Sequence, residues 1–152
     1  VYDAAGHNFA LTMLKLFKER DRLRVVADQW GAPTYAPALA EATLTGLKSA
    51  MSQPVFPSGI YHLCHGGATS WHGFAHAIFA LATSYESGIN CVQIDPINTN
   101  EYPTAARRPA NSRLNCDKAK RVLHISLPDW QEGLQAWAQA RYDNHRRDTT
   151  RS

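Results

Sequence analysis

The chain has 152 residues, of which 44% are hydrophobic and 19% are charged, and its formal net charge is +3. These values fit one soluble globular domain and exclude a disordered protein. The mild charge, with no basic stripe interleaved with aromatic residues, favours no nucleic-acid partner. No apolar run reaches the ~18 residues of a membrane span, so we expect no membrane partner.

The three cysteines, Cys64, Cys91 and Cys116, are widely spaced and form no CxxC motif. The simplest interpretation is that they are reduced thiols in a cytoplasmic protein. The opening residues "VYDAAG" resemble the end of a strand running into a loop. We therefore expect the sequence to begin within a longer protein.

The first third of the chain predicts two helices with a strand between them. Asn8 suits the N-cap of a helix that places Phe9, Met13 and Phe17 on one face. The second helix carries Leu44 and Leu47 at helical spacing. The elements expected here are a helix from Asn8, a strand over 23–28, a Gly/Pro turn over 29–34 and a helix over 34–51.

The rest of the chain continues the alternation of strands and helices. Ser70 is placed to cap a helix that buries Phe74, and Pro128 suits the first turn of a last helix containing Trp130 and Trp137. The order of elements predicts an α/β fold, in which three short strands make a thin sheet that would fit better within a larger one. The elements expected here are a strand over 60–65, a helix over 71–85, a strand over 91–97, a polar loop over 103–115, a short helix over 116–123 and a last helix from about 128.

A cluster of histidines and one cysteine raises the possibility of a zinc site. His72 and His76 are four residues apart on a predicted helix and therefore share a face. This is not the HExxH motif, and on the preceding strand His62 and Cys64 point one way while His65 points the other. We therefore expect ordinary packing or surface histidines and no metal, and keep a zinc-binding module as the weakest alternative.

The loop "PTAARRPANSRLN" (103–115) is the best candidate for a binding site. Its arginines offer planar donor groups that match phosphate oxygens, and its prolines restrict the backbone. A solvated loop whose arginines pair with surface carboxylates is the alternative, and composition alone leaves both open. The chain has no GxGxxG, no GxxxxGK[ST] and no GxSxG motif, so no self-sufficient active site is expected.

Five segments in order resemble the C-terminal half of the dTDP-4-dehydrorhamnose reductases, a family of the extended short-chain dehydrogenase/reductase superfamily. The resemblance covers nearly the whole chain, and "DQWGAPT" together with "ARRPANSRL" is its most specific part. The five segments are "VYDAAGHNFALTMLKL", "VVADQWGAPT", "GIYHLCHGGATSWHGFAHAIF", "YPTAARRPANSRLN" and "LPDWQEGL".

The resemblance implies an NAD(P)-binding Rossmann-like fold of which this chain is the substrate-binding part. Enzymes of this family reduce dTDP-4-dehydro-L-rhamnose to dTDP-L-rhamnose with NADPH or NADH, for bacterial surface polysaccharides. Their catalytic Tyr-x-x-x-Lys pair has no counterpart here, since none of the six tyrosines is followed four residues later by lysine. The resemblance therefore implies that no residue of this chain is catalytic and that the chain alone is inactive.

The resemblance also assigns binding roles to particular residues. Val1 and Tyr2 are expected near the nicotinamide of NADP or NAD, which the missing N-terminal half of the same protein would hold. Glutamates that hold a bridging magnesium ion in some dimeric members are replaced by Pro37 and, as we align it, Ala140. The residues expected to bind the dTDP-sugar are Asn8, Phe9, Gln29, Gly31, Pro33, Thr34, Arg107, Arg108, Asn111 and Arg113.

Further expectations concern the partners and the extent of the domain. We expect a substrate-binding lobe over 1–143, a polar and disordered tail over 144–152, and a bacterial cytoplasmic location. Apolar faces that would pack on the missing half could drive self-association. The alternative function is a non-catalytic regulatory or binding subunit, because the superfamily includes the regulatory subunit of methionine adenosyltransferase.

Overall fold

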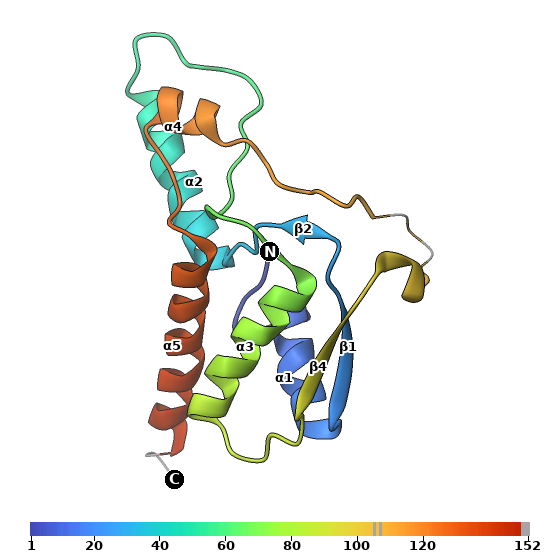
Figure 1. Ribbon diagram of the computed structural model, residues 1–152. Helices are drawn as coiled ribbons and strands as arrows, with labels where there is room; N and C mark the ends of the chain where they lie inside the picture. The colour runs from blue at the N-terminus through green and yellow to red at the C-terminus, as the bar shows by residue number, and fades with distance from the viewer. Residues whose placement is uncertain (105, 107, 150–152) are drawn as a thin grey trace.

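The computed structural model describes residues 1–104, 106 and 108–149, with the side chains of the last helix described as far as Tyr142. Helices and strands alternate, so the α/β class predicted from the sequence is confirmed. The elements, shown in Figure 1, are α1 (Phe9–Glu19), β1 (Arg22–Val26), β2 (Trp30–Gly31), α2 (Ala36–Met51), β3 (Thr69–Ser70), α3 (Trp71–Tyr85), β4 (Gln93–Ile97), η1 (Thr99–Glu101), α4 (Asp117–Leu123) and α5 (Trp130–Thr149).

The expected helix from Asn8 is confirmed, and its cap explains where it starts. The Asn8 side-chain oxygen accepts a hydrogen bond from the Leu11 backbone N–H, which would otherwise be unpaired at the helix end. Helix α1 buries Met13, Leu14 and Phe17. This face packs on α3, whose N-cap Ser70 accepts from the Gly73 N–H as predicted.

Strands β1 and β4 form a parallel pair, with Leu23 opposite Ile94. Leu23 and Val25 are buried while Arg22 and Arg24 are exposed, because successive side chains of a strand point to opposite faces. On the exposed face Arg22 forms an ion pair with Asp95, which lowers the pKa of that carboxyl through a hydrogen bond.

The expected single thin sheet is wrong: the described strands make two separate pairs. The second pair is antiparallel and joins β2 to β3, two residues each. The expected strand over 60–65 is also wrong, because it makes no ladder with any described strand. The residue that follows this segment, Gly66, forms an isolated bridge with Asp129. The apolar and aromatic residues of this run predict an extended backbone, but a strand also needs a neighbour to receive its hydrogen bonds.

Most of the buried side chains belong to one main core between α1, α3, α5 and the β1–β4 pair. The N-terminal segment runs into it: Tyr2 donates its N–H to the Thr34 carbonyl and accepts from Ala36 N–H. Trp137 of α5 is fully buried there and donates its indole N–H to the Asp3 carbonyl at 2.9 Å. The hydrogen bond from Trp137 thus attaches the N-terminal segment to helix α5.

Helices α2 and α4 lie apart from the β1–β4 pair (Figure 1) and share a much smaller cluster. It contains Ala50 of α2, Ala119 and Leu123 of α4, and Ile125. The expected helix over 34–51 is confirmed, but Leu44 and Leu47, whose spacing indicated it, lie on the exposed side. The side that α2 buries instead carries the small residues Gly46 and Ala50.

The last helix continues to Thr149, so the backbone does not end its regular structure at the expected domain boundary of 143. The division into a lobe over 1–143 and a tail stays a prediction, and residues 150–152 lie outside the described residues. Among the residues that the structure describes, no helix is both long and apolar enough to cross a membrane.

Candidate functional site

The candidate loop follows β4, and its first residues are hydrogen-bonded to the residues that follow β1. The Asp28 carboxylate accepts hydrogen bonds from the backbone N–H and the hydroxyl of Thr99, which lowers the pKa of Asp28. The next residue, Gln29, donates its amide to the same hydroxyl at 3.1 Å. The first turn after β4 is therefore attached by hydrogen bonds to the start of the "DQWGAPT" turn.

The far part of the loop is paired with that turn as well. The Trp30 N–H donates to the Ala110 carbonyl, and the Trp30 carbonyl accepts from the backbone N–H of Ser112, both at 2.8 Å. The Ser112 hydroxyl donates to the same carbonyl. A Cβ on Gly31 would lie 2.7 Å from the Ser112 hydroxyl oxygen, so a larger residue here would displace that hydroxyl from the Trp30 carbonyl. Residues 110–112 are thus an attached strand-like segment, which neither sequence interpretation of the loop anticipated.

One cavity, of about 340 Å³, lies beside this attachment, and we call it the aromatic cavity. It collects six residues that the sequence assigned to ligands: Val1, Tyr2, Phe9, Gln29, Gly31 and Pro33. Besides Ala32, the rest of its lining consists of aromatic and hydroxyl side chains, namely Trp30, Trp71, Phe74, Thr69, Ser70 and Ser112. The cavity therefore offers flat apolar surfaces with a few polar groups, as small-molecule sites commonly do.

The aromatic side chains of the cavity support one another. The Phe9 ring lies 4.8 Å from Trp71 and stacks on Phe74 at 5.8 Å between centroids. Trp30 is 49% exposed, an unusual state for a large aromatic residue. The Arg108 guanidinium carbon lies 5.9 Å from the centre of the Trp71 ring, within the range of a cation–π contact. A positive charge is therefore present at the edge of the aromatic surface.

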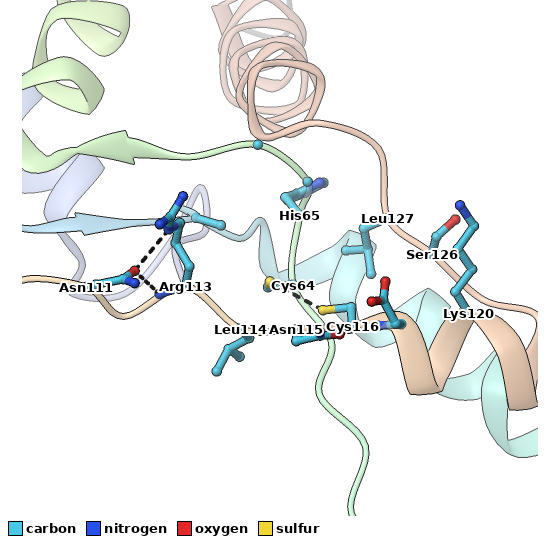
Figure 2. Close-up of a pocket in the computed structure, with 14 residues that line it drawn as sticks. Cys64, His65, Asn111, Arg113, Leu114, Asn115, Cys116, Lys120, Ser126 and Leu127 are labelled. Carbon is cyan, nitrogen blue, oxygen red and sulfur yellow. Dashed lines mark hydrogen bonds between the residues drawn. The ribbon is translucent and has the colours of Figure 1, made fainter.

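A second cavity, of about 530 Å³, lies on the other side of the attached segment (Figure 2), and we call it the cysteine cavity. Asn111 and Arg113 line it, whereas Ser112 between them lines the aromatic cavity. This split follows from extended backbone, in which alternate side chains point to opposite sides. The Asn111 side-chain oxygen accepts from both the backbone N–H and the Nε–H of Arg113 (Figure 2), which fixes the arginine.

Three predicted site residues, Asn8, Thr34 and Arg108, are not among the lining residues of either cavity. Asn8 uses its side chain for the cap of α1 and donates to the Asp3 carbonyl at 3.0 Å. Thr34 is buried, and its hydroxyl donates to Ala32 O and accepts from His65 N–H. Asn8 and Thr34 thus shape the backbone around the aromatic cavity. Arg107 lies outside the described residues.

Tyr2 and Val1, which the sequence assigned to the cofactor, differ in their surroundings. Tyr2 packs against Tyr35, Phe74 and Trp137, and its buried hydroxyl has no hydrogen-bond partner among the described residues. Burial raises the pKa of this phenol far above its usual range, and the charge of Tyr35 adds to the effect. Val1 is exposed at the cavity rim.

The histidines have separate partners in the fold. His65 is buried and its Nδ1 lies 2.8 Å from the Pro128 carbonyl, while His72 Nε2 lies 3.1 Å from the Ile94 carbonyl. The His72 and His76 rings meet edge to face. Across the described ranges 1–104, 106 and 108–149, no three residues of the metal-ligating types gather into a site.

Sequence reasoning missed several residues of the aromatic cavity. The sequence pattern predicts Trp71 and Phe74 as part of the helix over 71–85 with no ligand role, and Ser112 is not among the residues expected to bind the dTDP-sugar. A signal did exist: Trp30 and Trp71 each stand next to a turn rich in glycine or small residues, where an aromatic side chain is difficult to bury. The pairing of Trp30 with residues 110–112 had no sequence signal.

The arrangement matches a known family. A family model described as the RmlD substrate binding domain matches residues 1–142. The chain belongs to this family. Two curated relatives are dTDP-4-dehydrorhamnose reductases: that of Shigella flexneri is 46% identical over 136 residues, covering 88% of this chain and 44% of that protein. That of Burkholderia thailandensis is 46% identical, covering 86% of this chain and 46% of that protein.

The fold of this RmlD-type chain is also found in solved structures. It matches a dTDP-4-dehydrorhamnose reductase from Bacillus anthracis, solved in complex with NADP, with a TM-score of 0.76 and 34% identity. The match covers 90% of this chain and 44% of that one. The chain thus spans less than half the length of these relatives and corresponds to their C-terminal half, so the predicted resemblance is confirmed.

Proposed function

We propose that this chain is the substrate-binding part of an NAD(P)H-dependent reductase that converts dTDP-4-dehydro-L-rhamnose to dTDP-L-rhamnose in the bacterial cytoplasm. The observation that carries the proposal is the aromatic cavity. Six residues assigned to ligands from the sequence come together there from three separate segments of the chain. The names of the relatives supply the reaction, and the cavity supplies a place for its substrate.

The chemistry of the aromatic cavity suits a nucleotide-sugar. Flat rings such as Trp30 and Trp71 stack on a pyrimidine base, and stacking is worth about 1–3 kcal/mol per base. Hydroxyl and amide groups such as Ser112 and Gln29 can bond to sugar hydroxyls or base edges. Arg108, held over Trp71, is placed for the diphosphate, because a guanidinium matches phosphate oxygens.

These residues do not form a dinucleotide site by themselves. The sequence contains no glycine-rich fingerprint, and the groups assigned to the cofactor are exposed Val1 and the enclosed Tyr2. A phenol whose pKa is raised by burial stays neutral, so it presents an uncharged surface to a nicotinamide. We derive no hydride-transfer step from this chain, whose role is to bind and orient the dTDP-sugar.

Binding of thymidine and of dTDP to the 152-residue chain tests the proposal by calorimetry. We expect Arg108→Ala to weaken dTDP roughly tenfold, because a charge-assisted hydrogen bond contributes ~1.5–3 kcal/mol, and to leave thymidine unchanged. Trp71→Ala should weaken both ligands, since it removes a stacking surface. Arg20→Ala, an exposed arginine at the end of α1, is the matched control and should change neither affinity. Equal losses of thymidine and dTDP in Arg108→Ala would contradict a diphosphate role.

Activity assays address the reductase itself. In the full-length protein, Arg107→Ala combined with Arg108→Ala should raise KM for the dTDP-sugar far more than KM for NADPH. The 152-residue chain alone should not oxidise NADPH in the presence of the keto-sugar. Turnover by this chain alone would refute the proposal that it only binds the substrate while the N-terminal half carries the catalytic residues. A full-length protein that binds the dTDP-sugar without reducing it would favour a regulatory binding subunit instead.

A further inference from the structure

Two of the three cysteines meet at the wall of the cysteine cavity, although 52 positions separate them in the sequence. The Sγ atoms of Cys64 and Cys116 lie 3.6 Å apart, in contact (Figure 2). Both residues are partly exposed and both line the cavity. Cys91 is buried elsewhere, in the main core, with its thiol directed at the Gln93 carbonyl.

The contact is part of a wider attachment between the segment before β3 and the start of α4. Lys118 donates from Nζ to the Ile60 carbonyl at 3.0 Å and lies 4.3 Å from the centre of the Tyr61 ring. Cys116 is the N-cap residue of α4, and Leu114, two residues before it, lines the same cavity as both thiols. Both thiols are therefore held on backbone that is fixed by other contacts.

We propose that Cys64 and Cys116 form a reversible disulfide bond when the protein meets a low-molecular-weight disulfide such as oxidised glutathione. A disulfide needs a sulfur separation of about 2.05 Å, which side-chain rotation and a small backbone movement can supply from a thiol contact. This inference does not rest on the proposed function.

The chemistry is two successive exchanges. The thiolate of one cysteine attacks the external disulfide, forms a mixed disulfide and releases one small thiolate. The second cysteine then attacks the protein sulfur, forms the Cys64–Cys116 bond and releases a second small thiolate. Two protein thiols lose two electrons and two protons in total, and the small disulfide takes both to become two thiols. Small dithiols reverse the reaction.

Contact between the two thiols lets one cysteine resolve the mixed disulfide formed on the other. Burial raises the pKa of the Cys64 thiol to about 11, and the hydrogen bond and charge of Cys116 act in the same direction. The thiolate is the nucleophile of the exchange, so the reaction should be faster in alkaline solution.

The bond would fix the part of the chain that carries Arg113. Cys116 follows this arginine by three residues, and both line the same cavity. A tether between Cys64 and Cys116 closes a long loop, and cross-links of that size restrict the unfolded chain strongly. The oxidised form should therefore melt at a higher temperature, by roughly 5–10 °C.

The proposal is tested by oxidising the folded chain and counting thiols after denaturation, so that the buried Cys91 is titrated as well. After treatment with oxidised glutathione and removal of the excess, we expect one titratable thiol of three, an intact mass lower by two hydrogen atoms, and a linked Cys64–Cys116 peptide after digestion. Dithiothreitol should restore three thiols. Cys91→Ala is the matched control: it should form the same bond and then show no thiol.

The single variants test whether each cysteine resolves the adduct of the other. In Cys64→Ser and in Cys116→Ser no internal disulfide should form, and a glutathione adduct on the remaining cysteine of the pair should persist until dithiothreitol is added. Three thiols retained in the oxidised wild-type chain, a bond that involves Cys91 or a second chain, or a melting temperature that does not rise would each overturn the proposal.

Discussion

The main core and the α2–α4 cluster differ in how completely they enclose their apolar side chains. The main core joins α1, α3, α5 and the β1–β4 pair, and it fully buries Phe17, Phe74, Ile78 and Trp137. The α2–α4 cluster contains four buried residues, of which two are alanines. On the outer side of α2, Leu44, Leu47 and Met51 are exposed.

The difference indicates that the stability of the main core comes from contacts within the chain, whereas the α2–α4 cluster would gain more from contact with another surface. A region that buries large side chains on all sides is stabilised within the chain, since burial of each contributes ~1.5–3 kcal/mol. A region of small buried residues and exposed leucines gains little from its own contacts and offers apolar surface to another one. Substitutions in the two regions should therefore have unequal effects.

The largest effect is expected at Trp137. Trp137→Ala removes a fully buried indole and its hydrogen bond to the Asp3 carbonyl, and should lower the free energy of unfolding by about 3–5 kcal/mol. Urea denaturation followed by circular dichroism measures this. Ile125→Ala, the matching change in the α2–α4 cluster, should cost clearly less, because its site is less enclosed. An equal cost at both positions would remove the distinction between the regions.

Two helical glycines sharpen the comparison. A Cβ at Gly133 of α5 would lie 2.3 Å from His65 Nε2, and that buried ring is held by the Pro128 carbonyl. A Cβ at Gly46 of α2 would meet Ile125 Cδ1 at 2.6 Å, the end of a flexible side chain.

Alanine improves helix propensity by ~1 kcal/mol at either glycine, so the difference between the two variants reports how far each neighbour can move. Gly133→Ala should destabilise by about 1–2 kcal/mol after this gain, whereas Gly46→Ala should be close to neutral. Thermal and urea unfolding of the two variants side by side provide the measurement. A Gly46→Ala variant as unstable as Gly133→Ala would mean that the α2–α4 cluster is packed as rigidly as the main core.

The rim of the main core carries a carboxylate that should make its stability sensitive to acid. Glu86 pairs with Lys18 at 2.5 Å and accepts from the Tyr142 hydroxyl at 2.7 Å. Burial alone would raise the pKa of Glu86, but these hydrogen bonds and the nearby cations outweigh it and leave the pKa below its usual value.

A lowered pKa in the folded state means that the stabilisation is present above the unfolded pKa and is lost as pH falls through the folded value. We therefore expect stability to decline below pH ~4.3, and Glu86→Gln to cost about 1 kcal/mol at pH 7 and less in acid. Unfolding curves at several pH values measure it. Glu19→Gln, an exposed partner of Lys15, is the control, and an identical pH response of both variants would exclude the role of Glu86.

The sequence predicted best those features that depend on neighbouring residues. The caps at Asn8 and Ser70 and the last helix that contains Trp130 and Trp137 follow from local pattern, and all are present. The strand over 60–65 failed because a strand is defined by its partner, which local pattern does not contain. For the same reason the predicted binding residues could be named individually, while their division between two cavities required the pairing of Trp30 with residues 110–112.

The smallest effect on stability and the clearest effect on association are expected on the outer face of α2. Leu44→Ser combined with Leu47→Ser should change the free energy of unfolding of the monomer by less than about 0.5 kcal/mol per site, because both side chains are already exposed. The same change should reduce concentration-dependent self-association in sedimentation velocity, because it removes apolar area from that face. Val92→Ser, an exposed apolar residue beside β4, is the matched control and should leave association unchanged. If Val92→Ser reduced association as much as the α2 variant, the outer face of α2 would have no special part in self-association. The α2–α4 cluster and the main core would then differ only in how tightly their buried side chains pack.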